Sequence, residues 1–298
     1  MPLLRVEAEK LSNNTLLQGI VEEIIDRDAM FAMLPFAAVN SKALVYNREN
    51  TLAGADWLDP NDTITEEAST FTEVTAKLRI LAGDVDVDKF LIETMGDTND
   101  QVVTQIQAKA KGVGRKFHAQ VAAGAAGAKA FDGIPNLVDP SMTFAVATNG
   151  GAVTLELLDQ LLDMVKNGAD ALVMRSGTWR AIRVLLRAMG GNTAQMIEIA
   201  NFGHPVPAFD GIPVIINDFL AGDETQGTND ATCSIYAVRF NEADGLHGIY
   251  GGASAGMRLE NIGTVQNKDA YRFRIKWYAS LVLKSTQSLA RLKGVTNI

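Results

Sequence analysis

The sequence predicts an α+β protein, and three observations support this fold class. Residues 98–124 carry an apolar stripe at helical spacing, which predicts one long helix. Residues 154–191 predict helix, strand and helix in turn, with a Ser/Thr cap before the second helix and Gly-Gly after it. Residues 271–284 alternate apolar and basic side chains, as in a long strand. At 298 residues the chain is long enough for one large domain or two ordinary ones.

The N-terminal quarter predicts a helix followed by an arm. Apolar residues in 12–27 share one helical face behind a Ser-Asn-Asn cluster. Residues 42–49 and 69–88 have the character of extended strands, and the segment between them is polar and acidic, with Asp-Pro-Asn-Asp as a turn signal. This connection is too long for a tight hairpin loop inside a compact domain.

The arm carries apolar side chains that it cannot bury by itself. They are Trp57, Leu58, Ile64 and Phe71. An isolated two-stranded ribbon has no core in which to place them. We therefore expect the arm to need a partner surface.

The hexapeptide AFDGIP occurs twice, at residues 130–135 and 208–213. The sequences around the two copies share little, so we do not interpret them as a duplicated domain. Asp-Gly suits a tight turn and Ile-Pro favours extended chain, so each copy predicts a turn that leads into a strand.

The remaining elements are shorter. Residues 88–96 predict a helical turn before the long helix. Residues 234–252 predict a hairpin around the turn NEADG. The strand at 271–284 closes the chain, with Arg272, Arg274 and Lys276 on one side and aromatic and aliphatic residues on the other.

Composition argues against several functional classes. The net charge of −8 argues against a dedicated nucleic-acid binder. The single Cys233 cannot form an internal disulfide, and its apolar surroundings predict a buried, inert thiol. No apolar run is long enough to span a membrane, and the charged residues 1–10 do not resemble a signal peptide.

The charges are segregated along the chain. Residues 48–73 contain one basic residue and seven acidic ones, including Glu66 and Glu67, whereas six basic residues and no acidic one follow Asp269. These segments are either ordinary solvated faces or complementary patches that meet across subunits.

No catalytic, cofactor or metal site emerges from the motifs. The sequence GASAG at 252–256 lacks the following helix and histidine of a nucleophile elbow. The glycines of GVGRKF lie within a predicted helix, and DVDVD at 84–88 lacks the later ligands of a calcium loop. The three histidines have no ligand spacing. We therefore expect no enzyme, no cofactor and no bound metal.

The order of these elements resembles the major capsid proteins of tailed phages, which have the Hong Kong 97 fold. DVDVDKFLIETMGD leading into the long helix, ADALVMRSGTWRAIRVLLRAMGG, FDGIPVIIND and the basic, aromatic last strand carry the resemblance, which covers nearly the whole chain. It implies an N-terminal arm at 1–39 and an E-loop at 40–77 that lies across a neighbouring subunit. It further implies a P domain with a long spine helix at 78–135 and 256–298, and an A domain at 136–255.

The resemblance implies a shell protein that assembles into pentamers and hexamers, forming an icosahedral head around double-stranded DNA held by weak contacts. The virion would be assembled in the host cytoplasm with a portal and possible decoration proteins. We expect the scaffold to be a separate protein, because no long segment precedes the E-loop. The E-loop has no lysine between Lys42 and Lys77 for the covalent crosslink that some relatives form.

For intersubunit contacts we expect Trp57, Leu58, Glu66, Glu67 and Phe71 on the E-loop. On the P domain we expect Arg272, Arg274 and Lys276. Two alternatives stay open: an encapsulin-type compartment that encloses protein cargo, and a soluble α+β enzyme.

Overall fold

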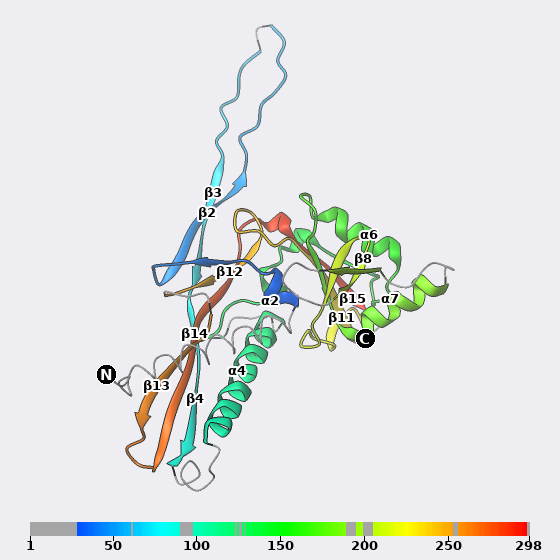
Figure 1. Ribbon diagram of the computed structural model, residues 1–298. Coiled ribbons are helices and arrows are strands. Elements are labelled where there is room, and N and C mark those ends of the chain that lie inside the picture. Colours follow the sequence, from blue (N-terminus) through cyan, green and yellow to red (C-terminus); the bar gives the residue numbers. More distant parts are fainter. Residues whose placement is uncertain are drawn as a thin grey trace.

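A computed structural model describes residues 29–60, 62–89, 98–122, 124, 127, 129–188, 195–198, 205–252 and 256–296. The helix predicted at 12–27 and, apart from Asp88 and Lys89, the turn predicted at 88–96 lie outside these ranges. In the described part, the strands form a five-stranded sheet, an eight-stranded sheet and a two-stranded hairpin, which projects from the rest of the molecule (Figure 1).

The five-stranded sheet is built around the long strand β14 (Ala270–Leu283). One side of β14 pairs with β12 (Leu246–Tyr250) and β13 (Arg258–Thr264), and the other pairs antiparallel with β4 (Arg79–Asp88). The short strand β1 (Phe36–Ala38) adds to β12 in parallel, after helix α2 (Ala29–Met33). The strand predicted at 271–284 is confirmed.

Helix α4 (Thr98–Ala122) runs along this sheet beside β4 and β14 (Figure 1). Its predicted apolar stripe is buried at Ile106, Val113, Phe117 and Val121. Because these side chains recur every three or four residues, they share the face that packs on the sheet. The long helix is therefore confirmed, ending at Ala122.

The eight-stranded sheet is mixed. Its order is β5 (Thr143–Ala145), β15 (Leu289–Val295), β11 (Asn229–Val238), β6 (Ala171–Met174), β9 (Ile212–Ile216), β8 (Pro205–Phe209) and β7 (Gln195–Glu198), with β10 (Glu224–Gln226) beside β11. Helices α6 (Leu155–Met164) and α7 (Ser176–Ala188) pack on one face, so the predicted helix–strand–helix is confirmed.

The two faces of this sheet belong to different cores. Leu172 faces α6 and α7, whereas its neighbour Val173 lies in the core that contains α4 and β14. This alternation follows from the two-residue period of a strand. The core that contains α4 and β14 therefore joins the two sheets.

The hairpin predicted at 234–252 is wrong. Strand β11 is already paired on one side with β15 and over its last residues with β6 on the other, so it has no free edge there for β12. The turn itself forms, with the amide of Gly245 donating to the carbonyl of Asn241 at 3.0 Å. The chain then enters the five-stranded sheet, where β12 pairs with β14.

The two copies of AFDGIP adopt different structures. In the second, Asp210 and Gly211 both have positive φ, 47° and 78°, and form the tight turn between β8 and β9, as predicted. The first leads into helix α5 (Ile134–Leu137) instead of a strand. Gly133 there has φ −80°, and a Cβ on it would lie 2.6 Å from the carbonyl oxygens of Gln120 and Val121. Close packing against the end of α4, and not turn geometry, requires this glycine.

The chain does not close on β14. After the short helix η2 (Thr286–Ser288) it enters β15, in the eight-stranded sheet, whereas β12 from the middle of the chain lies in the other sheet. Strand β12 falls within the expected domain 136–255 and β15 within the expected segment 256–298, but each lies in the sheet of the other domain. The remaining short helix, η1 (Pro140–Met142), precedes β5.

Candidate functional site: the projecting hairpin and the ion-pair face

The predicted arm is a hairpin of β2 (Ala43–Thr51) and β3 (Thr70–Lys77), joined by the long connection at 52–69. Its apolar side chains are exposed in the subunit. The exposed fraction is 104% for Trp57, 77% for Ile64 and 64% for Phe71, and Leu58 is also exposed. The prediction that the arm cannot bury them is confirmed. Exposed apolar side chains gathered on one projection are typical of an interaction surface.

Polar contacts hold the two sides of the connection together. The amide of Ala53 donates to Ser69 Oγ at 3.0 Å, and the amide of Gly54 donates to Glu67 Oε2 at 2.6 Å. Glu67 therefore stabilises its own hairpin, whereas Glu66 is exposed beside it. The ordered backbone reduces the entropy that a partner would have to remove on binding.

The root of the hairpin is tied to the end of β14. The hydroxyl of Tyr46 donates to the carbonyl of Leu283 at 2.6 Å, and the Arg48 guanidinium donates to the carbonyls of Leu283 at 2.7 Å and Lys284 at 2.9 Å. Burial raises the pKa of the Tyr46 phenol, although Arg48 opposes the shift. These bonds fix the direction in which the hairpin leaves the body.

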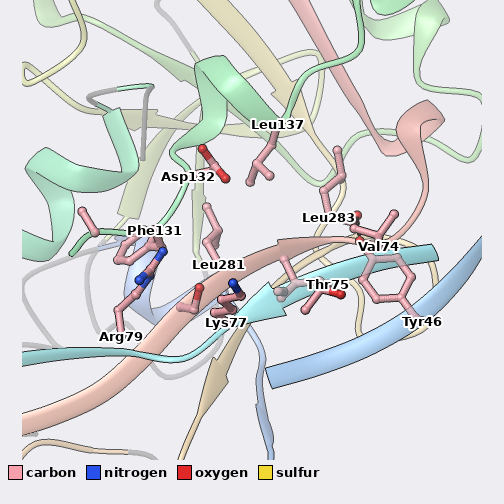
Figure 2. Close-up of a pocket in the computed structure, with 14 residues that line it drawn as sticks. Tyr46, Val74, Thr75, Lys77, Arg79, Phe131, Asp132, Leu137, Leu281 and Leu283 are labelled. Atoms are coloured by element: carbon pink, nitrogen blue, oxygen red, sulfur yellow. Dashed lines mark hydrogen bonds between the residues drawn. The ribbon is translucent and has the colours of Figure 1, made fainter. Parts of the chain in front are cut away.

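A groove of about 280 Å³ lies beneath the root (Figure 2). Its walls come from β3, from β14 and from the first AFDGIP with α5. Phe131, Leu137 and Leu281 make the lining partly apolar, and Lys77 and Asp132 are among its charged residues. Because both the hairpin and the body line this groove, its shape depends on the tilt of the hairpin.

Arginines and aspartates form a ladder across β14 and β4. Arg272 makes two hydrogen bonds to Asp86 at 2.6 and 2.7 Å, and Arg274 makes two to Asp84 at 2.7 and 2.8 Å. Lys276 pairs with Glu260 on β13. The three predicted basic contact residues are thus engaged within their own subunit. The aspartates that bind the two arginines, Asp84 and Asp86, come from the motif DVDVD.

The ladder predicts a specific response to acid. The hydrogen bonds from Arg274 and Arg272 hold the pKa of the Asp84 and Asp86 carboxyls below the usual value, and burial partly opposes this. A carboxyl with a depressed folded pKa stabilises the fold above its unfolded pKa of about 3.9, and this contribution is lost as pH falls through the folded value. The double variant Asp84→Asn/Asp86→Asn is expected to melt below wild type at pH 7, with a gap that narrows towards pH ~2.

Thermal melting between pH ~7 and ~2 measures this gap. The variant Asp56→Asn/Asp223→Asn is the matched control, since it removes two exposed carboxylates elsewhere in the chain. A gap between Asp84→Asn/Asp86→Asn and wild type that stays constant with pH would show that the ladder contributes no pH-dependent stability.

The ladder face also carries apolar side chains. Ile80 is 73% exposed and lies directly across from Tyr278 in the β4–β14 register. Together with Ala82, Arg274 and Lys276 they line an open groove of about 530 Å³. The alternation of the strands could have identified Ile80 and Tyr278, since both belong to the polar side of their strands.

The other sequence motifs supply no chemistry in the described residues. The thiol of Cys233 is fully buried and burial raises its pKa, as expected of an inert cysteine. The central serine of GASAG lies outside the described ranges. No group of three His, Cys, Asp or Glu side chains that could hold a metal ion was found among the described residues. Within the same ranges, no helix is long and apolar enough to cross a membrane.

The structure resembles solved shell proteins over most of its length. The holo-SrpI encapsulin complex of Synechococcus elongatus PCC 7942 matches with a TM-score of 0.69 at 18% identity, over 99% of this chain and 96% of that one. The capsid of the native GTA particle matches at 0.61 and 15%, over 90% of each chain. A structure of Mycobacterium phage Bobi matches at 0.62 and 11%, over 89% of each. No family model and no curated protein sequence matches.

These matches define the class of fold. Phage capsids and encapsulins are both among the neighbours, and both have the Hong Kong 97 fold. The chain therefore has the Hong Kong 97 fold, and the resemblance drawn from the order of its sequence motifs is confirmed.

Proposed function

We propose that the protein is the major capsid protein of a tailed phage, forming an icosahedral shell from pentamers and hexamers. The projecting hairpin carries the proposal: a chain with this fold exposes Trp57, Ile64 and Phe71 far from its own core. A second copy of the chain supplies the surface that these side chains need. The function is structural, without catalysis, cofactor or metal.

The receiving surface that we propose is the ladder face of a neighbouring subunit. Ile80 and Tyr278 offer apolar contact to Trp57, Leu58 and Phe71. Arg274 and Lys276 line the same groove, and Arg272 lies further along the same face. Their charges are already balanced by Asp84, Glu260 and Asp86. Glu66 and Glu67 would therefore join an existing network at its rim, where an exposed ion pair is worth only about 0–1 kcal/mol. Apolar burial supplies most of the contact.

In the terms of this fold, we propose residues 1–39 as the N-terminal arm and 40–77 as the E-loop. The P domain comprises 78–135 and 256–298, with α4 as its spine helix, and the A domain comprises 136–255. Two strands do not follow this division. Strand β12, from the A-domain range, lies in the sheet of the P domain, and β15, from the P-domain range, lies in the sheet of the A domain.

The further partners follow from the same proposal. A portal and a separate scaffold protein direct assembly in the host cytoplasm, decoration proteins are possible additions, and the mature virion encloses double-stranded DNA. A subunit with net charge −8 holds this DNA by weak contacts, so that the genome can be packed and released.

An encapsulin-type compartment is the second candidate. The SrpI encapsulin covers 99% of this chain with a TM-score of 0.69, against 0.61–0.62 for the GTA and Bobi structures. The two functions share the fold and differ in what the shell encloses.

Expression of the protein alone, and together with the genes that flank it, tests the proposal. Electron microscopy is expected to show closed shells, and shells formed with the neighbouring genes are expected to hold nuclease-protected DNA. Free subunits are expected to bind duplex DNA only weakly at physiological salt. Shells filled with a cargo protein would favour the encapsulin, and a monomer at every concentration would overturn both candidates.

A further inference from the structure

Two helices of the eight-stranded sheet carry charges of opposite sign at the same spacing. Helix α6 exposes Glu156, Asp159 and Asp163 and contains no basic residue. Helix α7 carries Arg180, Arg183 and Arg187 and contains no acidic residue. Residues at i, i+3 and i+7 lie along one side of a helix, so each set forms a ridge. We call these the α6 ridge and the α7 ridge.

Neither ridge is engaged within the part of the subunit that the structure describes. Among the described residues, no ion pair or hydrogen bond engages any of the six side chains. The Nε atom of Arg183 is also shielded from water without a hydrogen-bond partner. Like charges along one ridge repel, so each ridge disfavours the isolated helix.

The two ridges do not meet in one chain because the helices lie over different strands. Both helices pack on the same face of the sheet, where Leu158 of α6 and Ile182 of α7 share one core. Helix α6 lies against β15 and β11. The start of α7 lies beside the end of β9, where the amide of Ser176 donates to Asp218 Oδ1 at 2.8 Å. Strand β6 lies between β11 and β9 in the sheet, so the two helices lie over different strands.

We propose that the α6 ridge of one copy docks against the α7 ridge of the next copy around a ring. The inference rests on the proposed shell function and deepens it by naming a contact between A domains. Two different patches of one chain that fit each other give a head-to-tail contact, which builds a ring when the rotation from copy to copy closes. Duplex DNA would satisfy the α7 ridge alone, whereas a second copy satisfies both ridges.

Charge reversal of each ridge tests this contact. The variants are Asp159→Lys/Asp163→Lys on α6 and Arg180→Glu/Arg183→Glu on α7. They leave Glu156 in the first turn and Arg187 in the last turn, where each favours its helix dipole. Each variant alone is expected to need about tenfold more protein, or higher, to assemble at low salt, since two attractive pairs become repulsive. Melting of the free subunit reports on folding.

A mixture of the two variants tests whether the ridges meet between two copies or within one chain. In a hexamer that alternates the two variants, every junction again joins opposite charges, and in a pentamer all junctions but one do. An equimolar mixture is therefore expected to assemble at lower protein concentration than either variant alone. The control Asp223→Lys/Asp230→Lys reverses two exposed charges that belong to neither helix and is expected to assemble like wild type.

The outcomes are distinct. Variants that assemble like wild type, or a mixture that recovers nothing although both variants fold, would overturn this contact while leaving the shell function intact. The contact would also be overturned if Arg180→Glu/Arg183→Glu assembled normally and lost only its DNA content. Wild-type protein that never assembles would overturn the shell function and this contact with it.

Discussion

Removal of residues 50–69 is expected to leave a folded subunit that no longer forms shells. These residues contain Trp57, Leu58 and Ile64, all exposed, and contribute no side chain to the buried cores. The root stays in place, because Tyr46 and Arg48 bind carbonyls at the end of β14. Joining the shortened strands by Asn-Gly supplies a turn that suits a two-residue hairpin. Thermal melting should change little, whereas sedimentation and electron microscopy should show assembly lost.

A point variant provides the matched control for this deletion. Trp57→Ser/Phe71→Ser keeps the hairpin length and removes only two large apolar side chains, so it should also impair assembly if apolar contact drives docking. Closed shells from the deletion variant would contradict the role of the hairpin. Shells from the point variant alone would assign that role to its backbone and charges instead.

Replacement of Phe117 by alanine is expected to lower the free energy of unfolding by about 3–5 kcal/mol. Phe117 is 1% exposed, and its ring centroid lies 4.7 Å from that of Trp277 and 5.3 Å from that of Phe31. It thus joins α4 to β14 and to the α2 segment. Loss of the ring leaves a cavity among elements that are distant in sequence.

Denaturant unfolding of the subunit measures this effect. Val184→Ala is the control, since Val184 is 56% exposed on α7 and its truncation should change stability by no more than about 0.5 kcal/mol. A loss below about 1 kcal/mol for Phe117→Ala would mean that the core between α4 and β14 is loosely packed.

Periodicity was sufficient where an element packs by one face. The stripe of α4 and the alternation of β14 both predicted the observed elements, because burial enforces the period. Pairing of strands was not predictable in the same way. The turn after β11 forms, yet β12 joins another sheet because the end of β11 is paired on both sides. The order of the strands in the sequence does not show which other strands occupy the edges of β11.

Of the expected contact residues, likewise, only some could be understood from the sequence alone. An apolar side chain on an arm without a core is exposed whatever the rest of the fold, so Trp57 and Phe71 could be predicted from sequence. Arg272 and Arg274 of β14 could not be assigned a partner, because the aspartates that neutralise them lie 186–190 positions earlier. Only the register between β4 and β14 brings Arg274 and Asp84 together.

The anchorage of the hairpin root has a mechanical consequence. Tyr46 and Arg48 hold the carbonyls of Leu283 and Lys284, which lie where the chain leaves β14 and turns through η2 towards β15. A pull on the hairpin tip is therefore delivered to the joint between the two sheets. The load then spreads into both sheets through the hydrogen-bonded ladders of β14 and β15.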